Sequence, residues 1–315
     1  AEAPMFREGV FIFDFDNRGQ VNPQWEAAPV IDGTDQVLEA LVLGLRDYVV
    51  KNRFFKVAIG ISGGIDSALV AALAVQALGR DNVVGVTMPS RYNSAATIAD
   101  AAKLAANLGI RFMTVPIEPT YKSFLEALTP AFEHTAPNEA EENIQARIRG
   151  SLLMALSNKF GWLVLTTGNK SEVSTGYCTL YGDTAGGFAV LKDVLKTTVY
   201  AVSRRINKRA GQEVIPESTI NRPPTAELRL NQKDEDSLGA YSQLDPVIVA
   251  YVEDNLSLAD LVKKSPGKEA YFKKVLSLID RNEYKRRQAP PGIKITPRSF
   301  GRDHRMPITN RYRSG

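Results

Sequence analysis

The sequence contains one cysteine, two histidines and no apolar run that approaches the length of a membrane span. A single cysteine, Cys178, excludes a disulfide framework within the chain and is typical of proteins in a reducing compartment. His134 and His304 lie far apart without ligand-like spacing, which argues against a zinc site or a catalytic imidazole. No signal-peptide pattern opens the chain, so we expect a soluble, cytoplasmic protein.

The sequence also has little excess charge of either sign. Its 39 lysines and arginines stand against 35 aspartates and glutamates, and the basic residues are scattered except at Lys285, Arg286 and Arg287. Anionic small substrates account for this small positive excess as well as nucleic acid does. We expect small-molecule partners, and neither nucleic acid nor a membrane.

A glycine-rich turn, S-G-G-I-D-S at residues 62–67, separates the β-branched run 56–61 from the alanine-rich run 68–78. The pattern predicts a buried strand that turns into a helix. Glycines let several backbone N–H groups approach one anion, and the helix N-terminus adds a partial positive charge. The spacing fits neither a Walker A loop nor a dinucleotide fingerprint. A plain turn is the alternative, but the whole pattern in this context favours a phosphate site.

Residues 56–166 alternate between strand and helix patterns, which is typical of a parallel sheet covered on both faces. The predicted strands are 56–61, 82–88, 110–117 and 162–166, and the predicted helices are 68–78, 95–108, 121–128 and 139–158. A helix over residues 37–49, capped by Thr34 or Asp35, precedes them. Before it, the alternating residues 6–16 predict a strand that ends in a turn at 17–19.

Ligands of open parallel sheets bind beyond the carboxyl ends of the strands. We therefore expect the chemistry after Ile61, Met88 and Thr166. The third of these ends carries T-T-G-N-K-S-E, residues 166–172, where hydroxyls, an amide, a lysine and a carboxylate share one loop. The glycine-rich segment 175–187 follows it and predicts a loop that closes over a ligand.

The turn S-G-G-I-D-S resembles the pyrophosphate loop of the N-type ATP pyrophosphatases, which split ATP between its α and β phosphates. With T-T-G-N-K-S-E, S-T-G-Y, L-Y-G-D, K-T-T-V-Y and P-P-T-A-E-L, it makes residues 37–285 similar to NAD synthetases, in particular to the synthetase domain of the glutamine-dependent kind. The resemblance implies a Rossmann-like α/β fold of the adenine nucleotide alpha hydrolase type, an open parallel sheet with helices on both faces. It also implies amidation of nicotinic acid adenine dinucleotide to NAD by ATP and ammonia through an adenylated intermediate, with release of AMP and pyrophosphate.

The resemblance assigns residues to ATP and Mg²⁺. It implies that Asp66 and Glu172 hold Mg²⁺ and that Asp66 and Lys196 are catalytic. Thr167 is placed at the adenosine, and Lys196 and Thr225 are placed at phosphate. The residues implied to bind ATP are Gly60, Ile61, Ser62, Gly63, Gly64, Ile65, Asp66, Ser67, Thr167, Lys196 and Thr225.

The resemblance places the deamido dinucleotide against Asn143, Arg147, Glu172 and Lys285. Without the motifs, Arg147 is a solvated charge, Lys196 an ordinary first-turn lysine and Lys285 part of a basic helix end. Compact ammonia-dependent members of the family carry a lysine where this chain has Leu180. That substrate contact is therefore missing here or supplied elsewhere.

The glutamine-dependent branch carries an amide-hydrolysing domain ahead of the synthetase. We interpret residues 1–33 as a strand and linker that remain from such a domain, 34–287 as the synthetase domain and 288–315 as a basic C-terminal tail. A private N-terminal hairpin is the competing interpretation. The resemblance also implies a homodimer, with ammonia taken up free or supplied by a separate glutaminase.

Two other functions stay open at this point. One is another adenylating amidotransferase with the same loop, such as a GMP-synthetase-like enzyme, although the later motifs fit it poorly. The other is a non-catalytic nucleotide-binding sensor, which would not need the carboxylate pair Asp66 and Glu172.

Overall fold

A five-stranded parallel sheet forms the centre of the computed structural model, which describes residues 3–23, 32–133, 135–229, 232, 238–309 and 312. The spatial order of the strands is β5-β4-β3-β6-β7. Their bounds are Val57–Gly60 for β3, Val83–Thr87 for β4, Arg111–Thr114 for β5, Leu163–Thr166 for β6 and Phe188–Ala189 for β7. Because the chain first builds β3, β4 and β5 in one direction and then adds β6 on the other side of β3, the strand order reverses between β3 and β6.

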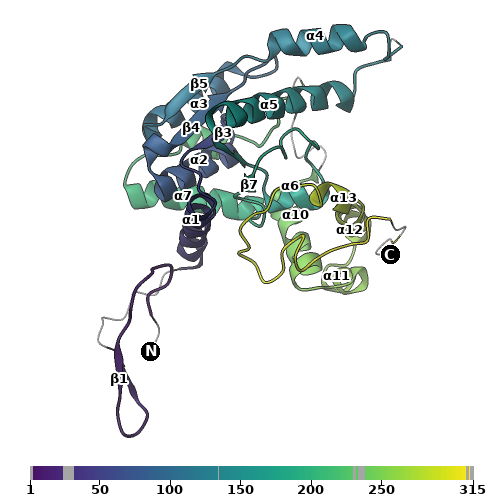
Figure 1. Ribbon diagram of the computed structural model, residues 1–315. Coiled ribbons are helices and arrows are strands. Elements are labelled where there is room, and N and C mark those ends of the chain that lie inside the picture. Colours follow the sequence, from purple (N-terminus) through teal and green to yellow (C-terminus); the bar gives the residue numbers. More distant parts are fainter. Residues whose placement is uncertain are drawn as a thin grey trace.

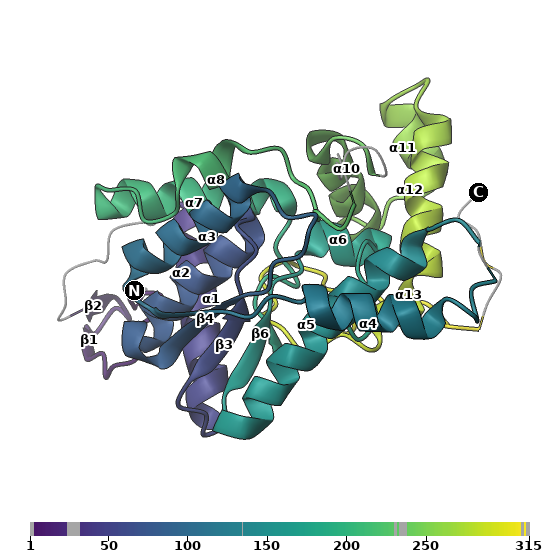
Figure 2. The same cartoon turned by 90° about the horizontal axis from the view of Figure 1, so that it is seen from above.

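Helices cover both faces of this sheet (Figure 2). One face packs against α1 (Gly33–Lys51), α2 (Ile65–Leu78), α3 (Ala95–Leu108), α7 (Lys196–Ala210) and α8 (Glu217–Asn221). The other face packs against α4 (Glu118–Leu128) and α5 (Glu139–Phe160). Successive residues of a strand point to opposite faces, so Val57 and Ile59 join the first core and Ala58 joins the second.

A helical layer with its own apolar core stands at one end of the sheet (Figure 1). It consists of α6 (Lys170–Thr175), α10 (Tyr241–Ile248), the π-helical turn η2 (Val249–Glu253), α11 (Leu258–Lys264), α12 (Glu269–Arg281) and α13 (Glu283–Arg286). Residues 288–309, predicted as a basic tail, return to the sheet from here. Gly292 bridges to Ala189 of β7, and Ile293 and Ile295 pack against the first core.

The N-terminal segment forms an antiparallel hairpin that projects away from the other layers (Figure 1). Its strands are β1 (Phe13–Phe15) and β2 (Val21–Pro23), so the strand is shorter than the predicted 6–16. Phe13 is 43% exposed and Phe15 is 67% exposed. The hairpin therefore presents apolar side chains that this chain does not bury.

The predicted α/β class is confirmed, with local differences at the ends of elements and three others. The strand at 162–166 is not the last, because β7 follows it after Gly186 and Gly187. Asp32, rather than Thr34 or Asp35, caps α1, since its carboxylate accepts a hydrogen bond from the N–H of Asp35 at 2.9 Å. The 3-10 turn η1 (Arg80–Asn82) occupies the start of the predicted strand 82–88. Over the described residues, no helix combines the length and apolarity needed to cross a membrane.

Candidate active site

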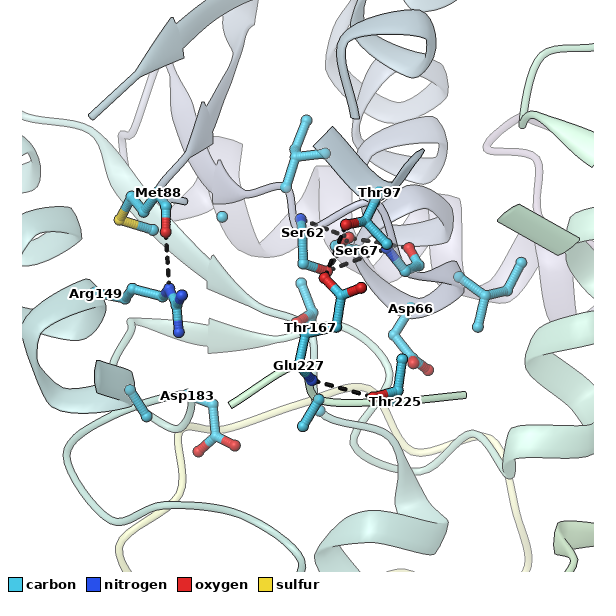
Figure 3. A pocket seen from close by; sticks show the side chains of 18 of the residues that line it. Ser62, Asp66, Ser67, Met88, Thr97, Arg149, Thr167, Asp183, Thr225 and Glu227 are labelled. Atoms are coloured by element: carbon cyan, nitrogen blue, oxygen red, sulfur yellow. Dashed lines mark hydrogen bonds between the residues drawn. The ribbon is translucent and has the colours of Figure 1, made fainter. Parts of the chain in front are cut away.

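The loops after β3 and β6 face each other where the strand order reverses, and a pocket of about 290 Å³ opens between them. Figure 3 shows Asp66, Thr167 and Thr225 reaching toward this pocket, with Arg149 on the opposite side from Asp66. All residues implied to bind ATP line it: Gly60, Ile61, Ser62, Gly63, Gly64, Ile65, Asp66, Ser67, Thr167, Lys196 and Thr225. Glu172 lines it too.

The turn at residues 62–67 is closed by its own serines. Ser67 Oγ accepts a hydrogen bond from the N–H of Ser62 at 3.3 Å, and Ser62 Oγ accepts one from the N–H of Gly64 at 3.2 Å. Gly63 has a φ of +84°, and a Cβ there would lie 2.2 Å from the carbonyl oxygen of Thr97. Only glycine fits this position, because both the backbone angle and the space exclude a side chain. The N-terminus of α2 follows directly, which favours an anion here.

A lysine and two carboxylates meet beside this turn. Lys196 Nζ donates to Asp66 Oδ2 and, at 3.2 Å, to Glu172 Oε1. Asn169 Nδ2 donates to Asp66 Oδ1 at 2.9 Å. These contacts join the starts of α2, α6 and α7, so three helix N-termini converge on one point.

The charge of Lys196 is determined by these neighbours. Burial lowers the pKa of its ammonium, but the carboxylates of Asp66 and Glu172 outweigh burial and raise the pKa above its ordinary value. Lys196 is the first residue of α7, where the helix dipole disfavours a cation. The two carboxylates, rather than helix stability, therefore account for a buried lysine in this place.

Glu172 has two roles in the structure. Asn169 and Glu172 form a capping box at the start of α6, as its first-turn position predicts. The capping bond uses Oε2, while Oε1 accepts from Lys196. The helix therefore fixes Glu172 in the orientation that directs Oε1 toward Asp66 and Lys196.

The donor set of this site fits Mg²⁺. Asp66 and Glu172 bring carboxylate oxygens to one ammonium from opposite loops, and no cluster of three or more potential metal ligands occurs among the described residues. Mg²⁺ is usually held by one or two carboxylates together with substrate phosphates and water. The pair is therefore suited to a cation that arrives with a nucleotide, and not to a closed structural metal site.

Three of the four residues implied for the dinucleotide lie beside this pocket rather than in its lining. Asn143 Oδ1 accepts from Thr179 Oγ1 at 2.5 Å, and the exposed Arg147 donates to the carbonyl oxygen of Leu180 at 3.3 Å. Lys285 Nζ donates to the carbonyl oxygens of Gly176, at 2.7 Å, and Cys178, at 2.9 Å. The three side chains gather around the segment 176–180 that follows α6.

Two ionisable groups in this neighbourhood have strongly raised pKa values. Asp183 lines the pocket as a solvent-exposed residue, and desolvation by the pocket wall raises its pKa to about 6, against the hydrogen bond that it accepts from the N–H of Thr179 at 2.7 Å. Burial raises the pKa of the Cys178 thiol to about 12, with Asp183 adding to the effect. A thiol of this kind is not an activated nucleophile.

Several pocket residues were not predicted. Arg149 from α5 donates to the carbonyl oxygen of Met88 at 3.0 Å, and burial lowers its pKa to about 10, so it stays charged at neutral pH. Glu227, with a φ of +48°, accepts from Thr97 Oγ1 at 2.8 Å and from Asn93 Nδ2 at 3.0 Å. Arg149 lies two residues after Arg147, and Glu227 belongs to P-P-T-A-E-L. The sequence alone does not show that either side chain lines the pocket.

Comparison with known proteins identifies the family. The family model described as NAD synthase matches residues 37–289. The glutamine-dependent NAD(+) synthetase of Thermotoga maritima is 52% identical over 295 residues, which are 94% of this chain and 51% of the relative. That of Acinetobacter baylyi is 47% identical over 312 residues, 99% of this chain and 58% of the relative. The chain thus spans somewhat more than half the length of these relatives.

Solved structures agree with this comparison. The glutamine-dependent NAD+ synthetase of Acinetobacter baumannii in complex with ADP superposes with a TM-score of 0.69 at 45% identity, over 99% of this chain and 57% of that one. The NMN synthetase of Francisella tularensis superposes with a TM-score of 0.68 at 27% identity, over 81% of this chain and 97% of that one. With the family model matched over most of its length, this chain belongs to the NAD synthase family.

Proposed function

We propose that this chain catalyses the ATP-dependent amidation of nicotinic acid adenine dinucleotide to NAD, with ammonia as the nitrogen donor and AMP and pyrophosphate as products. The convergence of Asp66, Lys196 and Glu172 on the turn at residues 62–67 carries the proposal. A site that only bound a nucleotide would not need two carboxylates around a buried lysine. Family membership and the ADP complex of the Acinetobacter baumannii enzyme support the same activity.

The first step joins the dinucleotide carboxylate to the α-phosphorus of ATP, with pyrophosphate as the leaving group. Two anions must approach each other, so their repulsion has to be offset. The N–H groups and serines of residues 62–67 and the ammonium of Lys196 would bind the departing pyrophosphate together with Thr225, and Thr167 would contact the adenosine; that all of them line one pocket supports these roles. Asp66 and Glu172 would hold Mg²⁺, which would supply additional charge neutralisation at the phosphates.

In the second step ammonia attacks the acyl carbon of the adenylate and AMP leaves. An acyl adenylate is reactive enough for neutral ammonia once the two are positioned. We assign the acceptor dinucleotide to the region around residues 176–180, where Asn143, Arg147 and Lys285 gather next to Glu172. The glycine-rich segment there adjoins the ATP pocket, so the two substrates can meet at Glu172.

We further propose that ammonia reaches this site free or from a glutaminase part of the kind that the glutamine-dependent relatives use. The Acinetobacter baylyi match covers 99% of this chain, so it extends well into the residues before Val37. This supports the interpretation of residues 1–33 as belonging to such a part, and the exposed Phe13 and Phe15 of the hairpin agree with packing against it.

We also propose a cytoplasmic homodimer that pairs through α5 and its neighbour α4. The exposed Met154 and Phe160 of α5 and Phe124 of α4 provide an apolar surface for it. Light scattering at several concentrations tests this pairing. A chain that stays monomeric up to high concentration would contradict it.

One assay tests the activity directly. The purified chain is mixed with ATP, Mg²⁺, ammonium and nicotinic acid adenine dinucleotide, and AMP, pyrophosphate and NAD are measured. We expect equal amounts of the three products. Release of ADP, or no turnover, would contradict the proposal. Nicotinic acid mononucleotide serves as the competing acceptor, because the Francisella tularensis relative is an NMN synthetase; a preference for it would change the substrate but not the reaction type.

A further inference from the structure

The N-terminus of α7, where Lys196 lies, has no cap from its own chain segment. The cap position is Leu195, whose side chain has no hydrogen-bond acceptor. The first N–H groups of a helix have no partner within the helix and need one elsewhere. Here the N–H of Lys196 donates to Ser171 Oγ at 2.9 Å, and the N–H of Thr197 donates to Asp245 Oδ2 at 2.9 Å. Two other helices therefore cap α7.

Asp245, from α10, is the centre of this arrangement. Its side chain is 2% exposed and accepts three hydrogen bonds. Besides the N–H of Thr197, the donors are Thr197 Oγ1 at 2.8 Å and Ser171 Oγ at 2.5 Å. Ser171 thus connects Asp245 to the backbone of Lys196, while it also lies next to Glu172 in α6. The carboxylate of Asp245 therefore binds Thr197, the neighbour of Lys196 in the chain, and Ser171, the neighbour of Glu172.

The same face of α10 also contacts the other end of Lys196. Tyr241 lies one turn before Asp245, and residues four apart share a helix face. The ring centroid of Tyr241 is 5.3 Å from Lys196 Nζ. Helix α10 therefore touches the backbone of Lys196 through Asp245 and Ser171 and its ammonium through an aromatic ring.

We propose that Asp245 is a positioning residue, which fixes the start of α7 so that the ammonium of Lys196 stays between Asp66, Glu172 and the phosphates of ATP. The inference rests on the proposed role of Lys196 in phosphate binding. A lysine side chain has a flexible four-carbon stem, so the position of its charge depends on a fixed backbone and on the groups that surround the stem, here including Tyr241. Partners that orient a directly contacting group commonly change affinity or activity by about 10- to 100-fold when removed.

The variant Asp245→Asn tests this proposal at constant side-chain volume. It removes the negative charge and places an amide N–H₂ against donors. We expect kcat/KM for ATP to fall by about 10- to 100-fold, with a raised KM for ATP and a KM for the dinucleotide within about twofold of the wild-type value. A residue that only attached α10 to the rest of the protein would lower the folded fraction. Loss of folded enzyme lowers apparent kcat and leaves both KM values unchanged.

Val247→Ala is the matched control. Val247 lies in the same helix and is buried in the core of the helical layer, and its apolar side chain forms no hydrogen bond with α7. Its KM values should equal those of the wild type. A double-mutant cycle with Thr197→Val should show strong non-additivity with Asp245→Asn, since both changes act on one network. Unchanged KM values for Asp245→Asn, or additive effects with Thr197→Val, would overturn the proposal.

Calorimetric titration with ATP and Mg²⁺ separates this inference from the proposed reaction. It needs no turnover, so it reports on Lys196 even if the chain makes no NAD. We expect weaker ATP binding by Asp245→Asn and unchanged binding by Val247→Ala. A wild-type chain that binds ATP but makes no NAD would contradict the proposed reaction alone. Equal ATP affinity in all three proteins would contradict the positioning role alone.

Discussion

Asn169 Nδ2 donates to Asp66 Oδ1 at 2.9 Å, and this bond ties the loop after β6 to the loop after β3. The two residues are far apart in sequence but adjoin because β3 and β6 are neighbours in the sheet. Asn169 also caps α6 and so orients Glu172. The amide therefore sets the spacing of the two carboxylates that we assign to Mg²⁺.

The variant Asp66→Asn should lose turnover by about 100-fold or more, because it removes one of two charges for a hard cation. Stability should change little, since the remaining pair of Lys196 and Glu172 is balanced in charge. Initial rates over a Mg²⁺ series and urea midpoints measure the two effects. Asp81→Asn, an exposed position beyond the other end of α2, is the control. Near-native activity of Asp66→Asn would remove Asp66 from the metal site.

Gly63→Ala should destabilise the fold by about 3 kcal/mol, because the new Cβ meets the carbonyl oxygen of Thr97 and backbone must shift. Gly211→Ala is the control that measures the cost of a positive φ angle without a steric clash. Gly211 ends α7 with a φ of +62° and has open space around it, so its loss should be only about 1 kcal/mol. Chemical denaturation of both variants gives the comparison. Equal losses would show that the contact with Thr97 does not matter.

Arg147→Ala should raise KM for the dinucleotide by about 10-fold, as expected for a lost charged contact, and leave KM for ATP unchanged. The prediction follows from its place next to Leu180, outside the ATP pocket. Lys159→Ala, an exposed charge near the end of the same helix, should change neither constant. Equal effects of Arg147→Ala on both substrates would move Arg147 out of the dinucleotide site.

Asp183→Asn should change how stability depends on pH. Desolvation by the pocket wall raises the pKa of Asp183 from 3.8 to about 6, so the folded state favours its protonated form, and the exposure of this residue to solvent keeps the effect on stability small. The wild-type protein therefore loses stability from this group as pH rises from about 4 through about 6, because the partly desolvated carboxylate then ionises. The amide does not titrate, so Asp183→Asn should become more stable relative to the wild type over that range. Urea midpoints at intervals from pH 4 to pH 7 measure it, and a constant difference would contradict the assignment.

Cys178→Ser should leave ammonia-dependent synthesis largely intact, and the purified chain should not use glutamine. With its pKa raised to about 12, the thiol is protonated at neutral pH and should react slowly with iodoacetamide. Rates with ammonium should increase as pH rises, because more of it is present as neutral ammonia. Glutamine-supported synthesis that Cys178→Ser abolishes would overturn both this prediction and the interpretation of residues 1–33 as a remnant.

The turn at residues 62–67 and its position in the sheet could be predicted, because S-G-G-I-D-S combines two local requirements, glycine angles and a strand–turn–helix pattern. The fifth strand, Phe188–Ala189, was missed because two residues carry no periodicity and two glycines precede them. Asp245 could not be found in this way. Its neighbours on the chain predict only an amphipathic helix, and its three donors come from α6 and α7, which only the tertiary structure brings to it.

The buried ammonium of Lys170 limits how early the candidate active site can form while the chain is being synthesised. It contacts Asp193 and Glu253, each at 2.8 Å, and donates to Thr296 Oγ1 at 2.8 Å. Because these partners are spread over about a hundred residues of sequence, the ribosome makes them at different times. The strands β3 to β7 can pair before residues 253 and 296 exist, whereas Lys170 and the first turn of α6 then lack their anchors. A nascent chain can thus form its sheet first and complete the candidate site only after residue 296 has been made, as expected where contacts of long sequence separation form last.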